Sequence, residues 1–291
     1  MELLVTIRNK SNYEKLLALA DGAIVGNRFT TSYHLDNNDI VEINNYCKAN
    51  NKKVYIVIDN FISEDELLSL NEYFYFIEGL NVDGIYFHDL GIYTIADSYG
   101  LKNKLIYDGK SVLCNSLDSA YMLSKGIDSV LISRELTLKE IKDIVKNNDG
   151  QVDLQIFGHI RLSYSKRKFL SNYFREINRE YDYLNKESLF LIEEKRDYKM
   201  PIVEDNDGTF IYSDFVVEMF EEMPELSSSI KRGIVDTLFI NDDNKIVEVC
   251  RNYKRINEAN AKFLKESLYH NYPDRYSKGY LYQKTNITKD E

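Results

Sequence analysis

The chain has 291 residues, of which 44% are hydrophobic and 29% charged, a composition that supports one large or two small packed domains and argues against disorder. Its formal net charge of -10 argues against nucleic acid wrapping the whole surface, although it leaves room for one local basic face. The three cysteines lie far apart and form no CxxC or Cys/His spacing, which argues against a disulfide framework, a zinc site or a cysteine-held cluster.

The chain starts with MELLVTI, which has neither the basic region nor the cleavage site of a signal peptide. No apolar run approaches the roughly 18 residues that a membrane span needs. We therefore expect a cytoplasmic protein that does not associate with a membrane.

Short apolar runs alternate with segments of helical periodicity along the first 160 residues. Predicted strands cover residues 3–7, 22–26, 53–58, 82–87, 104–107, 129–132 and 152–157. Predicted helices between them cover residues 12–19, 37–50, 63–78, 92–99, 116–123 and 137–146. Strands that are apolar throughout and separated by helices are typical of a parallel sheet covered on both faces.

An eighth strand is expected only at residues 235–240, after a long interruption. Eight β units with one insertion predict an α/β fold, namely a (β/α)8 TIM-like barrel. We expect one barrel domain over residues 1–291, with a small α+β insertion at about 161–230 between the seventh and eighth strands. A doubly wound open sheet is the alternative architecture.

Turn and alternation patterns predict the elements around the eighth strand. Residues 189–194 and 197–203 alternate like a hairpin, and EDNDG at 204–208 predicts a turn into a further strand at 209–212. Helices are expected at 214–223 and, as one long element, at 247–268.

Polar residues follow most of the predicted strands, and a barrel would gather them at the end where barrels carry their chemistry. The candidate catalytic residues of this mouth are Asp59, Asp89, Arg134, Glu135 and His159, with Asn27, His88, Asp108 and Asn241 at equivalent strand ends. The alternative is that Arg134 and Glu135 form an internal ion pair and that the aspartates are turn residues or helix caps. The sequence contains none of the GxSxG, HExxH, P-loop or GxGxxG signatures.

The stretch at residues 158–174, GHIRLSYSKRKFLSNYF, differs from the rest of this acidic chain. It follows the seventh predicted strand, and we interpret it as a loop rich in basic, aromatic and hydroxyl groups, which is typical of a site for an anionic ligand. The residues expected to bind RNA or another anion are Arg161, Ser163, Tyr164, Ser165, Lys166, Arg167 and Lys168. The alternative is a solvated helix face with charge pairs along it.

Four segments resemble peptidase family U32, the collagenase-like proteases: ADGAIVG at 20–26, VDGIYFHDLG at 82–91, ISRELTLKEI at 132–141 and SYSKR at 163–167. Each motif is short, but together they occur in the family's order and spacing over nearly the whole chain. Many family members carry cysteines that flank the SYSKR-like segment and resemble ligands of an iron–sulfur cluster. Here those positions hold Arg161 and Lys168, and residues 161–230 contain no cysteine, so we expect no iron–sulfur cluster and no other metal.

The segments SKR at 165–167, NYF at 172–174 and PIVEDNDGT at 201–209 resemble a short type of U32 protein from Firmicutes. That type acts with a longer U32 partner to form 5-hydroxyuridine at the wobble position of tRNA, a reaction linked to prephenate. The resemblance implies the same role here, with tRNA and a longer U32 protein as partners. The alternatives are a peptidase, as the family name suggests, and a non-catalytic scaffold subunit of a U32 complex.

Overall fold

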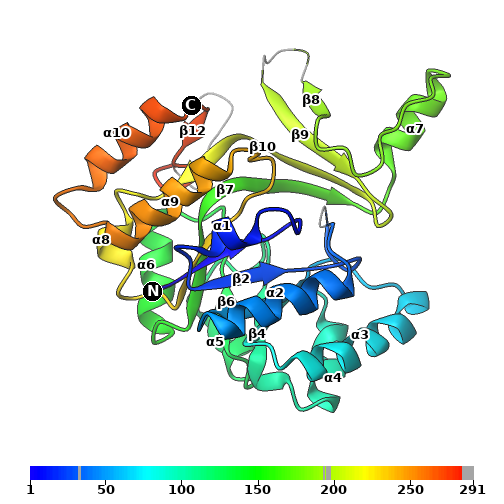
Figure 1. The fold of residues 1–291 in the computed structure, drawn as a ribbon, viewed down its shortest axis with the longest axis horizontal. Coiled ribbons are helices and arrows are strands. Elements are labelled where there is room, and N and C mark those ends of the chain that lie inside the picture. Colours follow the sequence, from blue (N-terminus) through cyan, green and yellow to red (C-terminus); the bar gives the residue numbers. More distant parts are fainter. Residues whose placement is uncertain (32–33, 193, 195–197, 284–291) are drawn as a thin grey trace.

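A computed structural model describes residues 1–31, 34–192, 194 and 198–283. Within this part of the chain, eight parallel strands surround a common axis (Figure 1). They are β1 (Glu2–Thr6), β2 (Gly22–Val25), β3 (Lys53–Ile58), β4 (Gly84–Phe87), β5 (Leu105–Asp108), β6 (Ser129–Leu131), β7 (Val152–Ser165) and β11 (Arg232–Val235). Because β11 pairs in parallel with both β7 and β1, the sheet closes. The predicted TIM-like barrel is confirmed, and the open doubly wound sheet is wrong.

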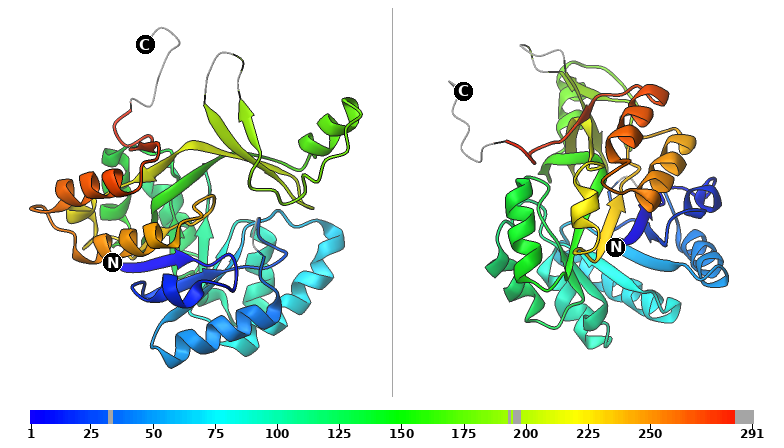
Figure 2. Two further views of the ribbon diagram at one scale, coloured as in Figure 1. Left: turned by 45° about the horizontal axis from the view of Figure 1, so that its top comes forward. Right: turned by 90° about the vertical axis from the view of Figure 1, so that its left-hand side faces the viewer.

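Helices follow the strands and cover the outside of the barrel (Figure 2). They are α1 (Tyr13–Leu17), α2 (Asn37–Ala49), α3 (Leu67–Leu80), α4 (Leu90–Ser98), α5 (Ser116–Leu123), α6 (Leu138–Asn147), α8 (Met223–Leu226), α9 (Asp243–Arg255) and α10 (Ala261–Asn271), with short 3₁₀ turns η1 (Glu64–Glu66) and η2 (Lys102–Lys104). A capping box formed by Thr137 and Glu140 is present at the start of α6. None of the described helices is both long and apolar enough to cross a bilayer.

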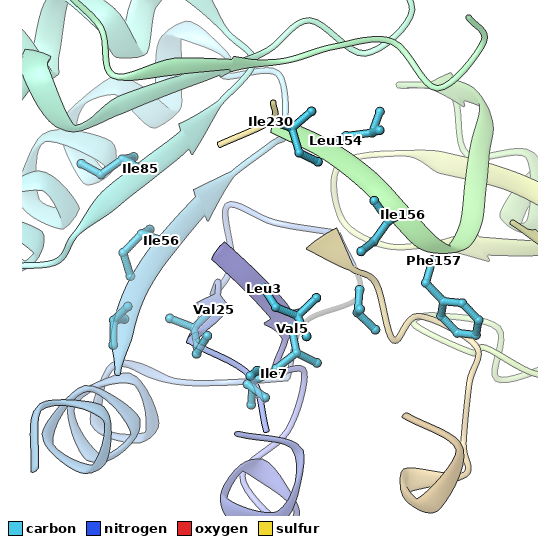
Figure 3. Close-up of a cluster of buried hydrophobic side chains, with 14 of the residues drawn as sticks. Leu3, Val5, Ile7, Val25, Ile56, Ile85, Leu154, Ile156, Phe157 and Ile230 are labelled. Carbon is cyan, nitrogen blue, oxygen red and sulfur yellow. The ribbon is translucent and has the colours of Figure 1, made fainter. Parts of the chain in front are cut away.

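Alternate residues of each barrel strand face two different cores. Leu3 and Val5 of β1 belong to the large core between strands and helices, which Figure 3 shows in part. Leu4, between them, packs inside the barrel with Tyr55 and Tyr86. This division follows from the period of two along a strand, and it explains why both faces of the strands are apolar.

The insertion forms an antiparallel ribbon that grows out of the barrel wall (Figures 1 and 2). Strand β7 does not end at residue 157 but continues to Ser165, where it pairs with β10 (Thr209–Glu218). Next to β10 lies β9 (Lys199–Glu204), and β8 (Phe190–Ile192) pairs with β9. Helix α7 (Phe169–Glu176) follows β7, and the short β12 (Tyr276–Ser277) pairs with the barrel end of β10.

The hairpin at 189–203 and the turn at 204–208 occur as predicted, although residues 193 and 195–197 of the hairpin lie outside the described residues. The helix predicted at 214–223 is wrong. Its first residues belong to β10, because Val216 and Val217 pair with His159 and Gly158 of β7 and this pairing outweighs local helical periodicity.

Apart from shifts of a few residues at the ends of other elements, two further predictions differ from the structure. The eighth strand covers 232–235 instead of 235–240, because Arg232 is a buried, ion-paired residue that interrupts the apolar pattern. The predicted long helix at 247–268 is two helices, α9 and α10, separated by a turn in which Asn257 and Asn260 bond to backbone groups.

Candidate functional site

A cavity of about 350 Å³ opens at the carboxyl ends of the barrel strands. Its wall combines residues that follow β3 to β6 and β11 with residues of the ribbon strands β7 and β10. Residues from seven segments far apart in the sequence thus meet at one opening, which is the position where barrel enzymes bind their ligands. The charged and aromatic lining residues are Asp59, Phe61, His88, Lys110, Arg134, Glu135, His159, Arg161, Tyr164, Tyr212 and Asp236.

Two carboxylates and three cations form a continuous chain of ion pairs at the cavity. Arg134 donates from Nη1 to Oδ1 of Asp108 at 2.7 Å, and Lys110 donates from Nζ to Oδ2 of the same carboxylate at 2.6 Å. Lys110 also reaches Oδ2 of Asp59 at 3.2 Å, and Arg161 donates to that oxygen at 3.1 Å. Each carboxylate is therefore shared by two cations, and the cluster carries one more positive than negative charge.

The cluster holds its groups ionised despite burial. Burial alone would raise the pKa of Asp108, but Arg134 and Lys110 outweigh it and hold this pKa well below its usual range. The pKa of Asp59 is likewise lowered, because Lys110 and Arg161 outweigh the effect of burial. Burial and the neighbouring Arg161 lower the pKa of Lys110.

Two histidines at the cavity are poised as neutral bases. Burial lowers the pKa of both His88 and His159, and for His88 the nearby charge of Lys110 adds to the effect. Nδ1 of His88 lies 2.9 Å from the carbonyl oxygen of Asp108, and Nδ1 of His159 lies 2.7 Å from that of Ser213. Since a carbonyl oxygen only accepts, each Nδ1 carries the proton, and Nε2 is the acceptor of each ring.

The structure brings together most of the predicted mouth residues. Asp59, Arg134, Glu135 and His159 all line the cavity. Asp89 does not, because it is the N-cap of α4, where Oδ1 accepts from the Gly91 backbone N–H at 2.8 Å. The helix-cap alternative is therefore the correct one for Asp89.

The remaining expectations for the mouth have mixed outcomes. The alternative that Arg134 pairs with Glu135 is wrong, because Arg134 is bonded to Asp108 and, through Nε, to Oε1 of Gln155 at 2.9 Å. Asn27 bonds to Asn37 outside the cavity, and Asn241 lies beside a different surface depression.

The basic stretch divides into an inner and an outer part. Arg161, Ser163 and Tyr164 line the cavity, and Arg161 is occupied by its ion pair with Asp59. The expected loop is instead the end of β7, and Ser165 closes that strand with its Oγ accepting from the Arg167 backbone N–H. Beyond it Lys166, Arg167 and Lys168 are exposed, and their side chains form no ion pair with any residue that the structure describes.

Sequence reasoning missed several lining residues. Lys110 follows the Asp-Gly pair at the end of β5 and adopts φ 53, a left-handed conformation that is uncommon for a lysine. The position of Lys110 two residues beyond a strand end is the sequence feature that could have identified it as a mouth residue. Gln155 was a polar residue inside an apolar strand, and its Nε2 bonds to the His159 carbonyl oxygen at 2.9 Å. Tyr212 carried no signal, because it was assigned to the insertion.

In the part of the chain that the structure describes, possible metal ligands and thiols do not gather at one place. Among the described residues, no group of three or more His, Cys, Asp or Glu residues is placed to hold a metal ion. Cys47 in α2 and Cys250 in α9 are buried, whereas Cys114 after β5 is exposed, so the thiols belong to different parts of the fold.

The chain is similar in sequence to three curated proteins. It is 29% identical over 177 residues to tRNA hydroxylation protein P2 of Bacillus subtilis, across 60% of this chain and 57% of that protein. It is 26% identical over 178 residues to tRNA hydroxylation protein P1 of the same organism, across 58% and 42%. It is 34% identical over 142 residues to an uncharacterized protease of Methanocaldococcus jannaschii, across 46% and 34%. The matches thus span about half or less of the length of these relatives.

The fold has a counterpart among solved structures. A U32 peptidase structure superposes with a TM-score of 0.50 at 13% identity, covering 81% of this chain and 92% of that one. At this identity the likeness supports the barrel fold alone. A sequence model of peptidase family U32 matches residues 22–291, which is nearly the whole chain and includes the cavity and the ribbon. The chain therefore belongs to peptidase family U32.

Proposed function

We propose that this protein takes part in tRNA modification, the 5-hydroxylation of the wobble uridine, together with a longer U32 protein. The observation that carries the proposal is the similarity of one chain to two separate tRNA hydroxylation proteins of a single organism. A system that uses two related proteins fits a chain that acts beside a partner of the same family.

The barrel mouth supports a chemical role in this reaction. A cavity of about 350 Å³ falls within the range of small-molecule sites and is open to solvent at the strand ends. His88 and His159 supply neutral acceptors at Nε2, while Lys110 and Arg161 supply positive charge near an anionic reactant. We propose that the reaction at this mouth is linked to prephenate and uses no iron–sulfur cluster of this chain.

The exposed cations beyond the mouth support RNA binding. Lys166, Arg167 and Lys168 follow one another on the surface, and no described residue neutralises them by an ion pair. Exposed lysines and arginines bind phosphate groups and position an RNA without reading its sequence. The net charge of -10 disfavours tight binding by this chain alone, so we place RNA recognition in a complex with the partner.

Nucleoside analysis of a deletion strain tests the proposal. Loss of 5-hydroxyuridine from tRNA, restored by the wild-type gene and accompanied by unchanged peptide cleavage, is the expected result. An unchanged nucleoside level with lost peptide cleavage would instead indicate a peptidase.

A second experiment distinguishes a catalytic role from a scaffold role. The double variant His88→Gln, His159→Gln removes both neutral bases while leaving hydrogen-bonding groups at the mouth. We expect this variant to be purified with the partner as efficiently as the wild type but to leave 5-hydroxyuridine absent. Full restoration of the nucleoside by the variant would mean that this chain acts only as a scaffold.

A further inference from the structure

Helix α7 presents aromatic side chains to solvent inside the most basic part of the chain. Residues 161–179 contain six lysines and arginines (161, 166, 167, 168, 175 and 179) against one acid, Glu176, in a chain of net charge -10. Phe169 and Tyr173 lie four residues apart on α7 and are 45% and 59% exposed, and no residue of α7 is buried. Figure 1 shows the helix at the outer edge of the ribbon, away from the barrel.

This exposure is not a consequence of a loosely attached helix. The first turn of α7 is fixed by the buried carboxylate of Glu204, which accepts from the backbone N–H groups of Leu170 at 2.7 Å and Ser171 at 3.2 Å. On the inner side, Phe174 stacks on Tyr183 with ring centroids 5.6 Å apart and planes 9° from parallel. The helix is thus anchored on one side. The ring of Tyr173 lies edge-on to Phe174 with centroids 5.4 Å apart, and the side chains of Phe169 and Tyr173 both remain about half exposed.

We propose that Phe169 and Tyr173 form a stacking platform for unpaired bases of an RNA strand whose phosphates contact Lys166, Arg167 and Lys168. This inference rests on the proposed function and names the part of the RNA that the ribbon binds. Exposed rings interleaved with cations are the arrangement that binds single strands, because every base has a face on which a ring can stack. A fully paired helix hides those faces, so the platform selects a loop or a single-stranded end.

The chain leads from the cavity to the platform through the end of β7 and the three residues that separate β7 from α7. Tyr164 lines the cavity, stacks on Phe61 at 5.2 Å, and precedes Phe169 by five residues, a backbone span of at most about 18 Å. An RNA strand bound on α7 would therefore continue toward the mouth of the barrel, where one base leaves the stack before chemistry on it can occur.

The absence of tryptophan from the sequence permits a direct test. The variant Tyr173→Trp places a single tryptophan on the platform, and Tyr121→Trp, on α5, is the matched control. Tyr121 is 62% exposed, close to the 59% of Tyr173, and has Lys125 at 4.3 Å from its ring, so a response to any exposed ring beside a cation would also appear at the control. Each variant, in complex with the partner protein, is titrated with a stem-loop RNA and with a fully paired RNA of the same nucleotide number.

We expect the stem-loop to quench the tryptophan at position 173 and the paired RNA to bind without quenching it, while the control tryptophan responds to neither. Tyr173→Ala should weaken stem-loop binding roughly 5- to 150-fold, and Tyr173→Phe should retain it, because stacking needs the ring and not the hydroxyl.

Three results would overturn the platform. Stem-loop binding without quenching, together with wild-type affinity of Tyr173→Ala, would leave the tRNA role intact but show that these rings do not stack. Quenching on addition of the partner alone would show that α7 is a protein interface. Absence of RNA binding by the wild-type complex would also reject the platform, and the nucleoside analysis would then decide separately whether the proposed function survives.

Discussion

Asp108 is the residue on which the charges of the mouth depend. Its carboxylate accepts from both Arg134 and Lys110, and its side chain is almost completely buried. Without this negative charge, Lys110, Arg134 and Arg161 would lie close together with only Asp59 to compensate them. Removing one partner of a buried ion pair is strongly destabilising because the other charge is left desolvated.

Asp108→Asn should therefore lower the free energy of unfolding by about 3 kcal/mol, measured by chemical denaturation at neutral pH. Asp149→Asn is the control, since Asp149 is exposed in a turn with φ 50, a conformation that asparagine adopts as readily as aspartate, so the stability of this variant should change by less than about 0.5 kcal/mol. Equal stabilities for the two variants would show that the mouth tolerates an uncompensated cation.

At the scale of elements, β7 and the residues that follow it contribute both to the cavity and to the proposed RNA-binding surface. One strand bears Arg161 at the cavity and ends next to the exposed cations that we assign to RNA binding. Arg161 and the three cations Lys166, Arg167 and Lys168 differ in role, because Arg161 forms an ion pair with Asp59 whereas the three cations are exposed.

Replacing Lys166 and Arg167 with alanine should flatten the dependence of log tRNA affinity on log salt concentration by roughly one unit or more, since each phosphate contact in a single strand contributes a slope of about -0.7. The melting temperature should hardly change, because exposed charges contribute little to folding. The control is Lys139→Ala, Lys146→Ala on α6, which removes the same charge from another exposed surface. An unchanged slope beside a large fall in melting temperature would identify Lys166 and Arg167 as structural.

The sequence predicted elements well where one local rule decided them. Buried parallel strands are apolar throughout, so β3 was predicted with its observed bounds. The outer half of β7 and the end of β10 were missed because their pairing is between segments about fifty residues apart, which no local periodicity records. The mouth was predicted from strand ends, but the partners of Arg134 depend on rotamers and distances that sequence spacing cannot supply.

At the scale of the whole molecule, the barrel has a second charge cluster at the opposite, amino-terminal ends of its strands. Arg232 of β11 donates to Asp153 of β7 at 3.1 Å and to the Tyr55 hydroxyl at 3.1 Å, and Asp153 also accepts from the Tyr86 hydroxyl at 2.7 Å. These residues come from β3, β4, β7 and β11, so this cluster joins strands around the barrel, and none of the four lines the mouth cavity.

Arg232→Met should consequently reduce the free energy of unfolding by about 3 kcal/mol, because it leaves the buried carboxylate of Asp153 without its cation. The affinity for tRNA should remain unchanged. Lys231→Met is the adjacent control: Lys231 is one-third exposed and pairs with Asp128, so its loss should cost no more than about 1 kcal/mol. Weakened RNA binding by folded Arg232→Met protein would contradict the separation of scaffold and site along the barrel axis.

The continuity of β7 determines how this chain can be recombined with its relatives. An exchange of residues 161–230 would cut a strand in its middle and separate Arg161 from the barrel wall that aims it at Asp59. Gly158, with φ 122, lies within the same strand so close to Asp236 that an added Cβ would be 2.6 Å from its carbonyl oxygen. Crossover points for a folded chimaera therefore lie before Val152 and after Glu218, so that wall and ribbon are inherited together.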